Sequence, residues 1–305
     1  MSATAEKVPS RRHAARLREG RAAWILALPF CLLFLTFTLW PVIQSLFMSV
    51  TDTRSRDLRT PFAVEFIGLE NFTRAFSDEK FLTSAGNTAY FVLVGVPLTM
   101  ALALAAALAL DKGITKFRSA FRLGFYTPVI TSIVAVAVVW RFLLQDEYGL
   151  FNTVLGWFGI DGPNWLGDPN WSMPSLIMLA AWRNFGTGMI IFLAGLQSVP
   201  WSLHEAAAID GANTVQRFRH ITLPLLRPTL LFVTVTTSIG YLQFFEEPFV
   251  MTRGGPLDST LSMSMYTYQQ FGFGNYGYAA AMSYIIFVVI AIVTAIQFRL
   301  LREKT

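Results

Sequence analysis

Six stretches of mostly apolar residues, each long enough to cross a lipid bilayer as a helix, constrain this chain more than any other feature. A membrane span needs about 20 such residues, because a helix rises about 1.5 Å per residue across about 30 Å of hydrocarbon. Only 14% of the 305 residues are charged, against about 25% in a soluble domain. The sequence therefore predicts an all-α, polytopic membrane bundle of six transmembrane helices. The six stretches are 22–47, 88–110, 123–144, 174–198, 229–245 and 279–300.

The basic residues are distributed unequally between the two sides of these predicted spans. With the N-terminus inside, 16 of the 24 Lys and Arg lie on that side, six lie outside, and two lie within spans. Lys and Arg accumulate in cytoplasmic loops, so a multi-pass protein of the cell membrane with both termini cytoplasmic is predicted. This topology accounts for the net charge of +5, and no nucleic-acid partner is expected. The predicted segments are a basic tail (1–21), a first transmembrane helix (22–50), an extracytoplasmic loop (51–83), a transmembrane core (84–300) and a second tail (301–305).

A cytoplasmic loop at 199–228, between the fourth and fifth predicted spans, has the pattern of two short helices. Gly211 suits a helix stop, because glycine adopts a left-handed conformation at little cost. Asn213 is a candidate cap for a second helix that runs to about Ile221. Apolar residues recur in this helix at one-turn spacing beside two arginines, an arrangement typical of a helix that docks on another protein.

The spacing within this loop resembles the EAA motif of ABC importer permeases. Glu-Ala-Ala is followed after three residues by Gly, and after nine more by Ile-x-Leu-Pro. The resemblance implies a type I ABC importer permease fold, in which this loop couples the membrane helices to an ATPase subunit. The residues assigned to that coupling are Glu205, Ala206, Ala207, Asp210, Gly211, Val215, Phe218, Ile221, Leu223 and Pro224.

Further stretches are similar to the carbohydrate-uptake class of these permeases, the maltose and glycerol-phosphate type. They include 68–72, 149–152, 193–197 and 251–256. The resemblance implies a sugar (a di- or oligosaccharide) or a related polyol or glycerophospho compound as solute. It also implies these partners: a second, homologous permease, two ATPase subunits that bind ATP and Mg, and an extracytoplasmic solute-binding protein. No cofactor is expected in this chain. Contact with the binding protein is assigned to the outer turn formed by Arg253, Gly254, Gly255 and Pro256.

Several polar residues lie within or beside the fourth and fifth predicted spans. Charges within a span are costly, so they indicate function by default. Arg183 could pair with Glu246 or Glu247, either as part of a polar solute path or as a structural ion pair that fixes helix register. The residues assigned to the solute path are Arg183, Asn184, Thr187, Tyr241, Gln243, Glu246 and Glu247.

Other classes of membrane protein find less support in the sequence. The second histidine of an H-E-x-x-H metal site is absent at position 208, no G-x-S-x-G occurs, and no metal site is expected. The sequence contains no Gly-Lys dipeptide, and so no P-loop with which the chain could energise itself. No span has a filter-like repeat of the kind that channels use. An importer of a non-sugar solute and, less favoured, an intramembrane enzyme remain alternatives.

Overall fold

The computed structural model describes residues 24–59, 64–113 and 117–301. The predicted tail 1–21 lies outside the described residues, as does nearly all of the predicted tail 301–305. The described chain is almost entirely helical and contains no strand, only an isolated bridge between Thr51 and Phe66. The prediction of an all-α fold is confirmed.

Four helices are long and apolar enough to cross a membrane unaided, and they match the first, second, fourth and sixth predicted spans. The first, Trp24–Ser49, includes the π-helical turn η1 (Leu35–Leu39) and the helix α2 (Trp40–Ser49). The others are α4 (Glu79–Leu108), which continues through the π-helical turn η3 (Ala109–Gly113), α8 (Pro169–Gln197) and α15 (Tyr276–Leu301). With two bent helix pairs counted as spans, the total reaches six.

The third predicted span is not one continuous helix. It consists of α5 (Arg118–Ile130) and α6 (Ile133–Leu143), which are bent by 98° where they join. Pro128 removes a backbone donor just before the break. The Thr131 hydroxyl then donates to the carbonyl of Thr127 at 2.9 Å. The span predicted over 123–144 is therefore a bent pair of helices, which crosses a membrane only if the pair is one span.

The fifth predicted span is also shorter and more bent than its apolar run suggested. Its helix α12 (Arg227–Leu242) follows the segment Thr214–Leu225 at a bend of 67°. It ends at Leu242, three residues before the predicted end, and a short helix α13 (Glu246–Met251) follows. The break between α12 and α13 places Gln243, Glu246 and Glu247 just beyond the end of α12.

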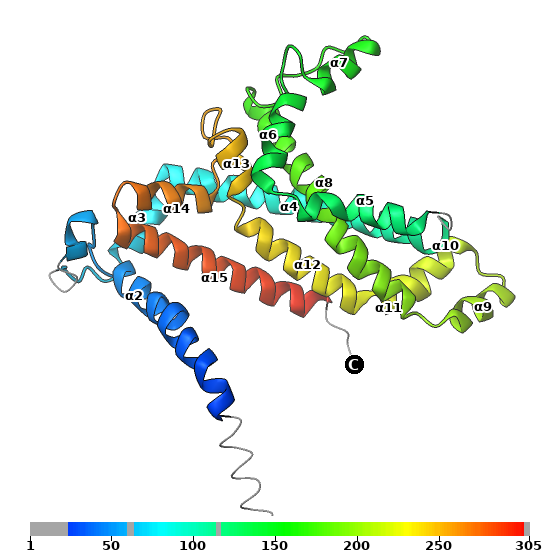
Figure 1. Ribbon diagram of the computed structural model, residues 1–305, viewed down its shortest axis with the longest axis horizontal. Helices are drawn as coiled ribbons and strands as arrows, with labels where there is room; N and C mark the ends of the chain where they lie inside the picture. Colours follow the sequence, from blue (N-terminus) through cyan, green and yellow to red (C-terminus); the bar gives the residue numbers. More distant parts are fainter. Residues whose placement is uncertain (1–23, 60–63, 114–116, 302–305) are drawn as a thin grey trace, which may run out of the picture.

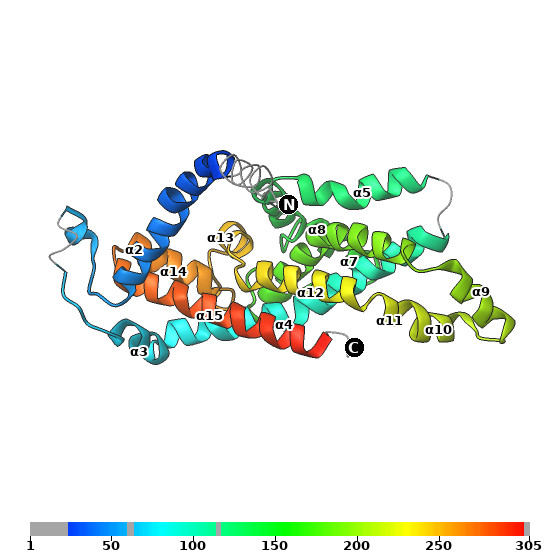
Figure 2. The same ribbon diagram turned by 90° about the horizontal axis from the view of Figure 1, so that it is seen from below.

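The helices α4, α8, α12 and α15 run side by side and form the body of the molecule (Figures 1 and 2). Close approach of α8 to its neighbours requires glycine, since a Cβ atom added at Gly188 would lie 2.9 Å from the Cβ of Ala103 on α4. The short helices α3 (Glu70–Ser77) and α14 (Met263–Gly272) lie at one end, and α9 (Trp201–Ile209) lies at the other (Figure 1). The helix α7 (Leu150–Trp157) projects sideways with α6 (Figure 1). A short 3-10 helix, η2, spans Ser55–Arg59.

Asp78 ties the N-terminal parts of three helices together. It caps α4 by accepting from the backbone N–H groups of Lys80 and Phe81. Its other carboxylate oxygen accepts from the hydroxyls of Tyr266 and Tyr278, at 2.7 and 2.8 Å. Burial by itself would raise the pKa of the Asp78 carboxyl, but these four hydrogen bonds outweigh it and hold the pKa below 3.8. Burial and the bond to Asp78 raise the pKa of Tyr266 to about 12, so its hydroxyl remains a donor.

Asp78→Ala is expected to lower the free energy of unfolding by about 2 kcal/mol, because a helix cap is lost and two buried hydroxyls lose their acceptor. The measurement is the thermal unfolding midpoint of the purified protein in detergent. Asp78→Asn keeps an oxygen that can cap the helix and should lower the free energy of unfolding by less. Because the folded-state pKa is depressed, the contribution is fully present above pH 3.8 and is lost as the pH falls through the folded-state pKa. Equal midpoints for wild type and Asp78→Ala would contradict this account.

Candidate functional site

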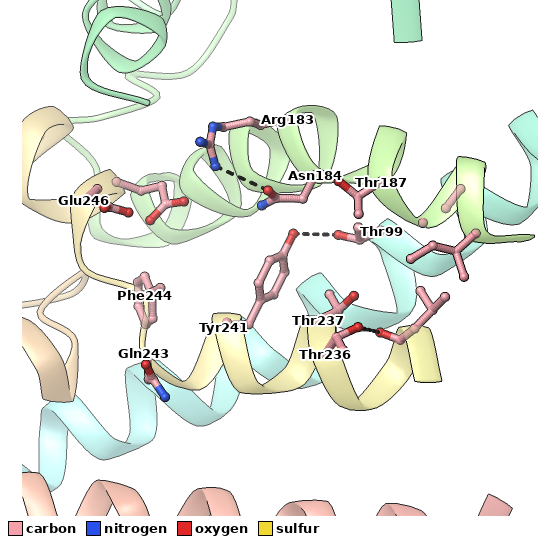
Figure 3. Close-up of a pocket in the computed structure, with 16 residues that line it drawn as sticks. Thr99, Arg183, Asn184, Thr187, Thr236, Thr237, Tyr241, Gln243, Phe244 and Glu246 are labelled. Atoms are coloured by element: carbon pink, nitrogen blue, oxygen red, sulfur yellow. Dashed lines mark hydrogen bonds between the residues drawn. The ribbon is translucent and has the colours of Figure 1, made fainter. Parts of the chain in front are cut away.

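A cavity of about 320 Å³ lies among α4, α8, α12 and α13 (Figure 3). It is lined by all seven residues that the sequence analysis assigned to a solute path. Five lining residues, among them Thr187, Gln243 and Glu246, are exposed, so the cavity opens onto the surface. The complete lining is Thr99, Ala103, Arg183, Asn184, Thr187, Gly188, Ile191, Val233, Thr236, Thr237, Gly240, Tyr241, Gln243, Phe244, Glu246 and Glu247.

Arg183 and Asn184 project from α8 toward this cavity (Figure 3). The guanidinium Nη1 donates to Asn184 Oδ1 at 3.3 Å, while Nε is buried without a hydrogen-bond partner. No ion pair within 4.0 Å joins Arg183 to a carboxylate anywhere in the described part of the chain. The predicted pairing of Arg183 with Glu246 or Glu247 is therefore not made in this conformation.

Tyr241 faces α8 from the opposite wall, on α12 (Figure 3). Its hydroxyl lies 2.7 Å from the Thr99 hydroxyl of α4. The ring fits only because α4 has a glycine at position 95, where a Cβ atom would lie 2.8 Å from the ring carbon Cε2. Sequence reasoning found Tyr241 but missed Thr99 and Phe244. The excess of threonine in the fifth span was the available signal for Thr236 and Thr237.

The two glutamates enter the cavity from the break between α12 and α13. Glu246 is exposed, and Glu247 is buried with only 6% of its surface accessible. Among the described residues that line the cavity, the acidic and basic side chains are one guanidinium and two carboxyl groups. Together with the amides and hydroxyls, they offer strong donors and strong acceptors in one space, which suits a solute rich in hydroxyl groups.

The loop at 199–228 folds as two short helices, as its sequence predicted. The helix α9 stops at Asp210, and Gly211 takes a φ of +82°. Asn213 and Gln216 form a capping box at the start of α10 (Thr214–Arg217). The second helix does not run evenly to Ile221. It continues as the π-helical turn η4 (Phe218–Thr222) and the short α11 (Leu223–Leu225).

The residues assigned to coupling are mostly at the surface of this loop. Glu205, Ala206, Asp210, Gly211 and Val215 are exposed, and the other five are half-buried. Val215 is 72% exposed, and Ile209 on α9 is 87% exposed. The predicted apolar stripe is thus uneven, because Val215 is exposed whereas Phe218 and Ile221 are half-buried.

The turn at 253–256 is compact and held by polar contacts. The hydroxyls of Thr252 and Thr260 lie 2.6 Å apart across it. Asn87 of α4 donates to the carbonyl oxygens of Asp258 and Leu261, which fixes the turn to the bundle. Arg253 is exposed and adopts a φ of +54°, and Gly254 adopts +87°. The predicted turn is confirmed, and it presents an arginine on the surface.

Comparison with known proteins identifies the family. The model of the family described as "Binding-protein-dependent transport system inner membrane component" matches residues 22–304. The chain is 40% identical over 288 residues to the probable ABC transporter permease protein YesP of Bacillus subtilis, covering 92% of this chain and 91% of that one. It is 35% identical over 287 residues to the lactose transport system permease protein LacF of Rhizobium radiobacter, covering 92% and 94%.

Among solved structures, the fold is similar to that of a bacterial ABC transporter involved in the import of the acidic polysaccharide alginate. The TM-score is 0.79 at 26% sequence identity, and the match covers 97% of this chain and all of that one. The sequence comparisons, this structural match and the loop geometry agree. The chain belongs to the family of binding-protein-dependent transport system inner membrane components, as a permease of an ABC importer.

Proposed function

We propose that this chain is the permease subunit of an ATP-driven sugar importer. The observation that carries the proposal is the convergence of seven polar residues on one cavity that opens at the surface; six come from α8, α12 and α13, and Gln243 lies just after α12. A sugar leaving water needs several groups to replace its hydrogen bonds, and this cavity offers them. The printed names of two similar proteins, one for lactose and one for alginate, support a saccharide as the solute.

The connection between loop and cavity supports alternating access as the mechanism. The helix α8 carries Arg183 and ends just before α9, and α12 begins just after the loop and carries Tyr241. Movement of the loop would therefore tilt α8 and α12, two of the four helices that wall the cavity. In this proposal the loop, with Glu205 and Gly211, docks on the ATPase subunit. Closure of the ATPases on ATP rocks the helices and exposes the cavity to each side in turn.

The partners follow from the same proposal. Two ATPase subunits bind ATP and Mg and dock on the cytoplasmic loops of this chain and of a second, homologous permease. That second permease closes the open side of the cavity, where Thr187, Gln243 and Glu246 are exposed. A solute-binding protein delivers the sugar at the outer turn that presents Arg253. Both termini are cytoplasmic, and the tails at 1–21 and 301–305 flank the membrane segments at 22–50 and 84–300.

The test is uptake by proteoliposomes that contain this chain, the second permease and both ATPase subunits. Radiolabelled lactose, trehalose and arabinotriose serve as probes, each with the binding protein present outside. Uptake of at least one probe that requires both ATP and the binding protein is expected. Uptake of amino acids or of a metal ion in place of every saccharide would favour a non-sugar importer, and a reaction without transport would favour an enzyme.

Gly95→Val is expected to lower sugar uptake by about tenfold while the complex still assembles. A side chain at position 95 would meet the ring of Tyr241 at 2.8 Å and displace it in the cavity, and a displacement of about 1 Å in a positioning group can cost two orders of magnitude in rate. Gly86→Val is the matched control, because it lies on the same helix with nothing within 4 Å of its added Cβ. Equal uptake by both variants would contradict a role for the Tyr241 position.

A further inference from the structure

The charges that line the cavity bear on the kind of saccharide it accepts. Similar proteins are named for both neutral and acidic solutes, lactose in one case and alginate in the other. Membership of the family therefore leaves the charge of this solute open. The ionisable groups of this chain's own cavity can decide between the two classes.

The cavity has no excess of positive charge with which to hold an anionic solute. Arg183 is the only cationic side chain among its lining residues, all of which the structure describes. With Glu246 and Glu247 both ionised, the lining has a net charge of −1. With Glu247 protonated, the net charge is zero. In neither state does the lining have a net positive charge to attract a carboxylate on the solute.

Arg183 is the one cationic group of the lining that could bind a carboxylate. The strong mode of recognition uses two parallel N–H groups of the guanidinium. Here one N–H of Nη1 donates to Asn184 Oδ1, and Nε is buried without a hydrogen-bond partner. A solute carboxylate bound by the remaining N–H groups would lie in the same 320 Å³ as the carboxyl groups of Glu246 and Glu247, which disfavour a further negative charge when ionised. A buried charge without full pairing is costly.

A neutral saccharide meets none of these penalties. Its hydroxyls can donate to the carboxyl oxygens of Glu246 and Glu247 and accept from Arg183, Asn184 and Gln243. Each such bond involves a charged or amide group of the cavity, and no like charges are brought together. We propose that the cavity selects uncharged saccharides over uronic-acid saccharides, with Glu246 as the residue at its exposed edge that disfavours a carboxylate. This proposal rests on the proposed function as a sugar importer.

The test uses the assembled complex of permeases and ATPases in nanodiscs without the binding protein, so that only the cavity selects. Equilibrium dialysis compares matched probes that differ in a CH₂OH or a carboxylate: galactobiose with digalacturonate, cellobiose with cellobiouronate, and mannobiose with dimannuronate. For each pair that binds, the neutral member is expected to bind at least about tenfold more tightly at low salt, with discrimination decreasing as ionic strength rises.

Two isosteric variants change the charge balance in opposite directions. Glu246→Gln removes one carboxylate and should reduce the discrimination by about threefold, since an exposed charge is screened. Gln243→Glu adds a carboxylate at another exposed position of the lining and should increase the discrimination. Equal binding of digalacturonate and galactobiose by the wild type, or an acid-to-neutral ratio that neither variant alters, would overturn the proposal and leave the sugar importer standing. Binding of none of the six probes would instead overturn the sugar site itself.

Discussion

Glu205→Lys is expected to leave ATP hydrolysis by the assembled complex near its wild-type rate and to lower sugar uptake by at least about tenfold. Glu205 is exposed on α9, and its carboxylate accepts from the indole of Trp201 at 3.0 Å. Lysine cannot accept that bond and reverses the charge at the proposed contact with the ATPase, where opposed like charges cost several kcal/mol. The measurements are ATPase rate and uptake in the same proteoliposomes.

Gly211→Pro tests the same loop through its backbone. Gly211 has a φ of +82° and donates its N–H to the carbonyl of Ala208, whereas proline fixes φ near −65° and has no N–H. The turn between α9 and α10 cannot form as observed, so uncoupling is again expected. Controls are Glu205→Gln, which keeps the acceptor, and Gly211→Asn, because asparagine tolerates the left-handed region. Normal transport by both Glu205→Lys and Gly211→Pro would exclude the coupling assignment.

Arg183→Ala is expected to abolish uptake, to below about 3% of wild type, while the complex remains assembled in the membrane. A hydrogen bond to a charged group contributes about 1.5–3 kcal/mol, and roughly 2 kcal/mol corresponds to a thirtyfold loss. Because Arg183 makes no ion pair among the described residues, its removal leaves no carboxylate without an ion-pair partner. The structure thus favours the solute-path interpretation over a structural ion pair.

The matched control is Arg141→Ala, at the other arginine within a predicted span. Arg141 is exposed on α6 and donates to the carbonyl of Val250 at 3.4 Å, away from the cavity lining. Near-normal uptake is expected from this variant. Quantitative immunoblots of the membrane fraction accompany both uptake measurements. Loss of the Arg183→Ala chain from the membrane, with Arg141→Ala retained, would establish the structural interpretation instead.

The sequence by itself determined the features that depend on neighbouring residues. Apolar runs of about 20 residues located the four unbroken spans, because burial in lipid depends on the local average of hydropathy. Gly211 and Asn213 located the stop and cap within the loop at 199–228, because caps and left-handed turns are properties of a few adjacent residues. The same holds for the turn at 253–256, in which Gly254 has a φ of +87°.

Only the tertiary structure decided which polar residues share a space. The hydroxyls of Thr99 and Tyr241 meet although 142 residues separate them, and nothing in either local sequence specifies the other. Only the tertiary structure gave the size of the 98° bend between α5 and α6, because a proline can kink or end a helix, or lie within an unbroken one, as Pro97 does in α4. Depth along a span suggested that Arg183 and the glutamates lie together. Whether they pair depends on side-chain rotamers and on the rotation of α8 about its axis. The packing of α8 against α4 and α12 determines both.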